Sequence, residues 1–154
     1  MSLIGKGSNK DIDNLKNLLE QKYGGKTTLF YKGREALSAA LKILDFPKGT
    51  SIAINGFTCV AVYKALRKAR CEPVCLDLER ESNLNFSPEI LEKALRVNKN
   101  IKAVVVQNTF GYPCDIEGIE QVCKKNKLVL IEDLAHCVGT RYKNGEEAGT
   151  VGDM

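Results

Sequence analysis

Histidine is almost absent from this sequence, and its cysteines form no metal-binding pattern. The 154 residues contain one histidine, His136, and six cysteines. The cysteines are irregularly spaced, and no two of them form a Cys-x-x-Cys pair. A structural zinc site needs four such ligands, so the sequence disfavours this class of site. We expect all six cysteines to be reduced thiols that pack as small hydrophobic residues.

Long apolar runs, low-complexity tracts and blocks of like charge are also missing. Apolar stretches such as residues 103–106 and 128–131 are far shorter than the roughly 20 residues of a membrane helix. The N-terminus lacks the apolar core of a secretion signal, from which we expect a cytosolic protein. The net charge of +4 is spread along the chain, which gives little support to nucleic-acid binding.

The composition fits one globular domain. Hydrophobic residues make up 44% of the 154 positions, enough to bury a core without disulfides or metals. We expect a single domain over residues 1–154, with an N-terminal helix within residues 1–25 and an α/β core over residues 26–154.

Apolar residues follow helical and strand patterns in alternation along the chain. Helical spacing predicts helices over residues 10–22, 34–44, 58–69 and 88–97, and another that begins after Asp115. Short apolar or β-branched runs predict strands at residues 51–54, 73–76, 103–107 and 128–131. Strands that alternate with helices pair in parallel through crossovers. The predicted fold class is therefore α/β, a three-layer α/β/α sandwich with a mainly parallel sheet.

Two local features refine this pattern. Ser87 precedes Pro88, so its hydroxyl is expected to accept from the free amides of the helix that starts there. Asn144-Gly145 separates two short polar-apolar segments, which predicts a hairpin over residues 141–148.

Ligands of parallel α/β sheets bind beyond the carboxyl ends of the strands, where helix N-termini converge. The candidate ligand-facing residues are therefore residues 55–59, Asp77, residues 107–112 and residues 133–136. Gly5-Lys6-Gly7 precedes any predicted strand, so it does not make a dinucleotide-binding fingerprint. Gly33 starts a predicted helix, where free amides can hold a phosphate. On position alone, the favoured interpretation is a glycine that merely begins a helix.

Asp133 and His136 follow the last predicted strand. A carboxylate at that place suits a cationic ring nitrogen, because opposite charges in a poorly solvated site keep both groups ionised. The alternative is that Asp133 caps a turn and His136 is a satisfied, partly buried side chain. A Ser-His-Asp catalytic set has no support beyond the closeness of these two residues in sequence.

Several segments together resemble the DegT/DnrJ/StrS family of sugar aminotransferases, pyridoxal-phosphate enzymes of the aspartate-aminotransferase fold. The matching segments are Gly33-Arg34-Glu35-Ala36-Leu37, Gly56-Phe57-Thr58-Cys59-Val60-Ala61, Phe110-Gly111-Tyr112-Pro113-Cys114-Asp115, Ile131-Glu132-Asp133-Leu134-Ala135-His136 and residues 139–153. Their order and spacing resemble the family from Gly33 to the end, the N-terminal part of its large domain.

The resemblance implies a cofactor, pyridoxal 5'-phosphate, and the residues that hold it. The implied cofactor-binding residues are Gly33, Arg34, Glu35, Thr58, Cys59, Asp133 and His136. The amides of Arg34 and Glu35, beside Gly33, would hold the phosphate, with Thr58 nearby. Asp133 would pair with the pyridinium nitrogen, and His136 would approach the ring's 3-oxygen. The family activity is amino transfer from an amino acid, usually glutamate, to a keto sugar nucleotide, carried out by homodimers.

The sequence departs from the family pattern at three points. Arg34 replaces the usual threonine, which leaves only backbone contacts to the phosphate, and Cys59 stands where many members place an aromatic ring over the cofactor. The family's Schiff-base lysine lies on a loop beyond the matched region, so no residue here is expected to take that catalytic role. We therefore expect the chain to be inactive alone; the alternative is a noncatalytic module that binds phosphate ligands or a partner. A Rossmann-type NAD protein ranks third, since the fingerprint is missing.

Overall fold

The computed structural model describes residues 8–79 and 84–154, and Gly5-Lys6-Gly7 lies outside them. The chain forms two compact units, Met1–Tyr31 and Lys32–Met154. In the first unit, α1 (Asn9–Tyr23) begins at a capping box in which Ser8 and Asp11 bond each other's backbone amides. It ends at Gly24, whose φ of 77° favours glycine. The helix predicted over residues 10–22 is confirmed.

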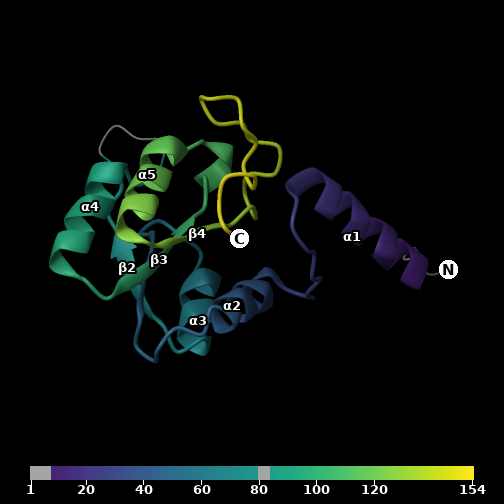
Figure 1. The fold of residues 1–154 in the computed structure, drawn as a ribbon, viewed down its shortest axis with the longest axis horizontal. Helices are drawn as coiled ribbons and strands as arrows, with labels where there is room; N and C mark the ends of the chain where they lie inside the picture. Colours follow the sequence, from purple (N-terminus) through teal and green to yellow (C-terminus); the bar gives the residue numbers. More distant parts are fainter. Residues whose placement is uncertain (1–7, 80–83) are drawn as a thin grey trace. The chain divides into compact units, whose positions relative to one another are not determined.

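The second unit is built on a four-stranded sheet, shown in Figure 1. Its strands are β1 (Ser51–Asn55), β2 (Glu72–Leu76), β3 (Ile101–Val106) and β4 (Val129–Glu132). All neighbours pair in parallel, in the order β2-β1-β3-β4. The central strands are apolar and almost wholly buried, because helices cover both faces of the sheet.

Four helices form the two outer layers. They are α2 (Gly33–Ile43), α3 (Val60–Lys68), α4 (Pro88–Val97) and α5 (Ile116–Asn126). The pair α2 and α3 lies on one side of the sheet and the pair α4 and α5 on the other (Figure 1). The predicted three-layer α/β/α sandwich is confirmed.

Alternation along the strands divides the interior into two apolar clusters. Ile52 and Ile54 of β1 pack toward α2 and α3, whereas Ala53 between them packs toward α4 and α5. Because successive side chains of a strand point to opposite faces, one strand supplies both layers of the core.

The structure corrects the predicted start of α3 and the predicted cap of α4. The third helix begins at Val60 rather than Thr58, and the Cys59 sulfur accepts from the Ala61 amide at 3.5 Å. Ser87 stands at the N-cap of α4 but makes no capping bond. Its hydroxyl bonds the Glu89 carboxylate instead, which lowers the pKa of Glu89.

The six cysteines are all free thiols, but they are not all core residues. The buried ones are Cys71, Cys114, Cys123 and Cys137; the exposed ones are Cys59 and Cys75. The expectation of six small core residues is therefore wrong for two of them. The hairpin over residues 141–148 is present as a single antiparallel bridge between Arg141 and Glu147.

Candidate functional site

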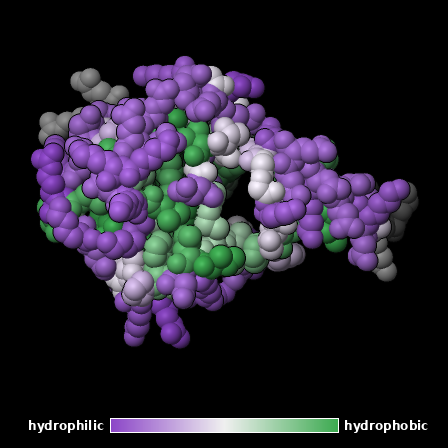
Figure 2. Space-filling view, viewed as in Figure 1, coloured by the Kyte–Doolittle hydropathy of each residue, from purple (hydrophilic) through white to green (hydrophobic). Residues whose placement is uncertain are grey.

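A cavity of about 530 Å³ opens beside the carboxyl ends of the strands, between α2 and β4. Its lining residues are Gly33, Arg34, Ala36, Leu37, Ala40, Cys59, Ala61, Val62, Gln107, Ile131, Glu132, Asp133, Leu134, Ala135, His136 and Met154. Figure 2 shows apolar side chains reaching the surface between β4 and α2. The volume lies in the range of small-molecule sites, and mostly apolar walls with a few polar groups are typical of them.

The N-terminus of α2 supplies the positive end of the cavity. Gly33 and Arg34 both line it, and the first amides of a helix have no partner within the helix. The capping residue, Lys32, makes no side-chain capping bond to them. The helix dipole favours a bound anion here, and Arg34 adds a positively charged residue to the lining.

Glu35 is the least suited of the predicted phosphate ligands. Its amide donates to the Lys32 carbonyl at 2.9 Å, and its side chain pairs with Lys68 of α3 outside the cavity lining. The hydrogen bond from Lys68 lowers the pKa of Glu35. This side chain therefore links α2 to α3.

A polar network joins the ends of β1 and β3. The Thr58 hydroxyl donates to Gln107 Oε1, and Gln107 Nε2 donates to the Thr109 hydroxyl at 3.3 Å. Asn55 Nδ2 reaches the same Thr109 oxygen at 3.5 Å. Thr58 does not line the cavity, but Gln107, which is 5% exposed, does. Gln107 directly follows a buried strand and is among the strand-end residues predicted to face a ligand, although the family resemblance assigns it no role.

Asp133 supplies the negative end of the cavity. Its amide donates to the Val106 carbonyl at 2.8 Å, which fixes it next to the end of β3. Oδ1 accepts from the Ala135 amide at 3.1 Å, so the turn-capping interpretation holds for this oxygen. Oδ2 has no hydrogen-bond partner within residues 8–79 and 84–154. One half-buried carboxylate oxygen is thus available to a ligand.

His136 lies in a cluster of exposed rings at the cavity rim. Its ring stacks on Phe110 with centroids 5.6 Å apart and an interplanar angle of 8°. Phe57 meets Phe110 edge to face at 6.2 Å. The alternative of a partly buried histidine is wrong, because His136 is exposed.

Most of the predicted site residues come together. Those that line the cavity are Gly33, Arg34, Cys59, Asp133 and His136. Its walls would enclose a flat ring, with an anion-binding helix start and a carboxylate available to its polar groups. These residue types fit pyridoxal 5'-phosphate, which carries a phosphate and a basic ring nitrogen. Among residues 8–79 and 84–154 no cluster of metal ligands is found, and no helix is long and apolar enough to cross a membrane.

Comparisons with known proteins place this arrangement in a family. Residues 11–154 match the model of the DegT/DnrJ/EryC1/StrS aminotransferase family. GDP-perosamine synthase of Vibrio cholerae is 34% identical over 127 residues, which cover 82% of this chain and 34% of that protein. A putative pyridoxal phosphate-dependent aminotransferase of Bacillus subtilis, EpsN, is 34% identical over 124 residues, 78% of this chain and 31% of that protein.

A solved structure agrees with these relatives. The aminotransferase from Psychrobacter cryohalolentis superposes with a TM-score of 0.81 at 27% identity, over 91% of this chain and 35% of that one. The chain thus spans about a third of the length of the relatives it matches. Its fold, its serial motifs and its match over residues 11–154 agree, and the chain belongs to the DegT/DnrJ/EryC1/StrS aminotransferase family.

Proposed function

We propose that this chain is the cofactor-binding part of an aminotransferase that moves an amino group, usually from glutamate, to a keto sugar nucleotide. The observation that carries the proposal is the cavity, in which Gly33 and Arg34 at a helix start accompany the available carboxylate of Asp133. Relatives named as a nucleotide-sugar synthase and a pyridoxal phosphate-dependent aminotransferase support it. The alternative, a noncatalytic phosphate-binding module, draws on the same helix start but leaves Asp133 without a role.

Each lining group has a distinct task in this proposal. Pyridoxal 5'-phosphate supplies an electron sink for substrate carbanions when it is bound. The amides of Gly33 and Arg34 bind its phosphate, and Asp133 holds a proton on the ring nitrogen by opposite charge. Gln107, fixed by Thr58 and Thr109, presents a rigid polar edge, and the apolar walls exclude water.

The change Asp133→Asn tests the proposal. Asparagine is nearly isosteric but uncharged, so the fold should persist while binding of pyridoxal 5'-phosphate, followed by equilibrium dialysis, weakens. In an active complete protein, a loss of about 3–5 kcal/mol would slow amino transfer by two orders of magnitude or more. The control Asp45→Asn makes the same chemical change at an exposed αL position, which asparagine tolerates. Equal binding by both variants would remove Asp133 from its role.

We expect no covalent link between pyridoxal 5'-phosphate and a lysine of the cavity. Within the described parts of the chain, no lysine is among its lining residues. Borohydride reduction with pyridoxal 5'-phosphate should therefore label scattered surface lysines, as peptide mapping would show. One stoichiometric, site-specific adduct would contradict this part of the proposal.

The assembly proposed for the protein is a homodimer that uses the face around Phe57. Phe57, Val60 and Phe110 are 48%, 61% and 65% exposed beside the cavity, and exposed apolar patches of this kind mark interaction surfaces. Light scattering across a concentration series should give a mass above the 17.0 kDa of one chain. Phe57→Ser should shift the mass toward the monomer if this face is the contact.

A further inference from the structure

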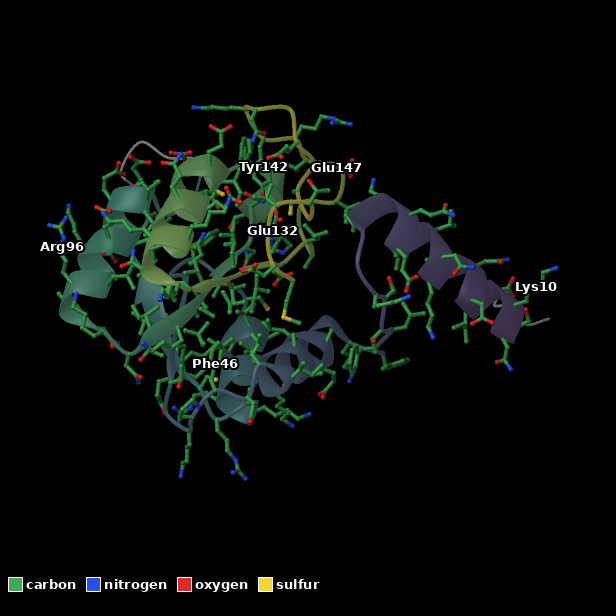
Figure 3. The ribbon with its side chains drawn as sticks, in the orientation of Figure 1. Lys10, Phe46, Arg96, Glu132, Tyr142 and Glu147 are labelled. Atoms are coloured by element: carbon green, nitrogen blue, oxygen red, sulfur yellow. The ribbon has the colours of Figure 1, made fainter. Side chains whose placement is uncertain are left out.

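The Glu132 side chain, next to Asp133, accepts four hydrogen bonds from the last part of the chain. Oε2 accepts from the Tyr142 hydroxyl at 2.6 Å and the Gly149 amide at 2.8 Å. Oε1 accepts from the amides of Val151 and Gly152 at 2.9 and 2.6 Å. Figure 3 shows Glu132 and Tyr142 facing the same region of the C-terminal segment. Only an ionised carboxylate can accept all four.

Tyr142 extends this network to the end of β3. It is 4% exposed, and its hydroxyl also accepts from Asn108 Nδ2 at 2.7 Å. Asn108 Oδ1 in turn accepts from the Cys114 amide at 2.9 Å. Burial, and next the bond to Glu132, raise the pKa of Tyr142, so the phenol stays a neutral donor. The ends of β3 and β4 are therefore tied by side chains as well as by the sheet.

Backbone bonds hold residues 153 and 154 along the outer edge of β4. The Glu132 amide donates to the Met154 carbonyl at 2.9 Å, and the Asp153 amide donates to the Leu130 carbonyl at 2.8 Å. A Cβ on Gly152 would lie 3.0 Å from the Leu130 carbonyl oxygen and 3.1 Å from Glu132 Cγ. A side chain at this position would therefore crowd both β4 and the Glu132 side chain, and its neighbours would have to shift by a few tenths of an ångström.

These contacts bear directly on the cavity, because Glu132, Asp133 and Met154 all line it. We propose that Glu132 is a positioning residue of the cofactor site: it clamps residues 149–154 to β4, which fixes the wall at Met154 and the backbone from which Asp133 projects. This role rests on the proposed function, because Asp133 is the group it serves.

Glu132→Gln tests the clamp by amide hydrogen exchange in the 154-residue chain. Glutamine can accept at only one of the two oxygen positions, and its NH2 group would face amide donors. Exchange at the amides of Gly149, Val151 and Gly152 should quicken roughly tenfold or more, while Ala53 and Val104 keep their rates. The control Glu146→Gln alters an exposed residue bonded to Asn144 in its own turn. Unchanged exchange at all three amides would overturn the proposal.

A carbon-13 carboxyl signal reports whether the clamp positions Asp133. In the parent, the Asp133 signal, assigned by its loss in Asp133→Asn, should move when pyridoxal 5'-phosphate is added. The response should be lost or much reduced in Glu132→Gln and in Gly152→Ala, which opens the clamp without changing charge. If the Asp133 signal moves equally in the parent and in both variants, the positioning role of Glu132 is overturned, and the proposed function stands. A parent without any response would overturn the proposed function and this role with it.

Discussion

The two helical layers of the sandwich are filled differently. Under α4 and α5, large side chains such as Leu91 and Ile119 are 0% exposed. Along the cavity, three of the lining positions on α2 and α3 are alanines, Ala36, Ala40 and Ala61, beside the larger Leu37 and Val62. These small side chains leave the space of about 530 Å³ open between α2 and β4.

This difference indicates that the α4/α5 layer contributes mainly to stability and the layer along the cavity mainly to ligand binding. Closely packed interiors gain dispersion and burial energy from every methylene group. A binding site must leave that space unfilled. The α2/α3 layer, which borders the cavity, therefore contributes less stability per residue than the α4/α5 layer. We therefore expect substitutions in the α4/α5 layer to act mainly on folding, and substitutions along the cavity mainly on ligand binding.

The largest expected effect is a difference in stability loss between the same substitution, leucine to alanine, in the two layers. Leu91→Ala removes a fully buried side chain and should lower the free energy of unfolding by about 3–5 kcal/mol. Leu37→Ala enlarges an existing cavity at a half-buried position, and should cost about 1–2 kcal/mol. Urea unfolding followed by circular dichroism measures both. Equal losses would refute the contrast between the layers.

Filling the cavity should affect binding more than folding. Ala40→Leu adds three carbons where α2 faces the open space, which a packed core would not tolerate but a cavity does. Binding of pyridoxal 5'-phosphate should weaken roughly tenfold or more, with unfolding changed by less than about 1 kcal/mol. Ala39→Leu, on the same helix but outside the lining, is the control. A cavity variant that binds like the parent would show that the ligand lies elsewhere.

The α4/α5 layer, which contains Cys123, should also lose stability at alkaline pH. Burial, reinforced by the charges of Asp153 and Glu120, raises the pKa of Cys123 to about 12 from 9.0. Between these pH values the unfolded thiol ionises while the folded one stays protonated, so stability falls as pH rises from 9. Cys123→Ala should remove the part of this fall in stability that comes from ionisation of the Cys123 thiol, as urea unfolding at several pH values would show. Parallel stability curves for parent and variant above pH 9 would contradict the expectation.

The smallest effect is a difference in thiol reactivity. Cys59 and Cys75 are exposed, whereas the other four thiols are buried, and burial raises the pKa of Cys114 and Cys123. Under native conditions a thiol reagent should react rapidly with Cys59 and Cys75 alone. After denaturation all six should react. Pyridoxal 5'-phosphate should protect Cys59, which lines the cavity, but not Cys75.

The sequence alone determined the layers, the strands and most of the helix bounds. Apolar periodicity is a local property, so residues 51–54 were recognisable as a strand, and residues 103–107 as a buried strand, without knowledge of their neighbours. The Asp115 cap was equally local, and its side chain accepts from the Gly118 amide at 3.1 Å. Serial motifs also led to the family and to the cavity-lining residues Gly33 and Asp133.

The meeting of distant polar groups depends on how the elements pack in three dimensions. Glu132 and Gly152 are 20 residues apart, yet they are bonded at 2.6 Å, and no sequence spacing encodes that approach. Gln107 enters the cavity because parallel pairing aligns the ends of β3 and β4. Glu35 pairs with Lys68 of α3 instead of lining the cavity. Local patterns set the secondary structure, but contacts between distant segments depend on packing, which follows from all the elements at once.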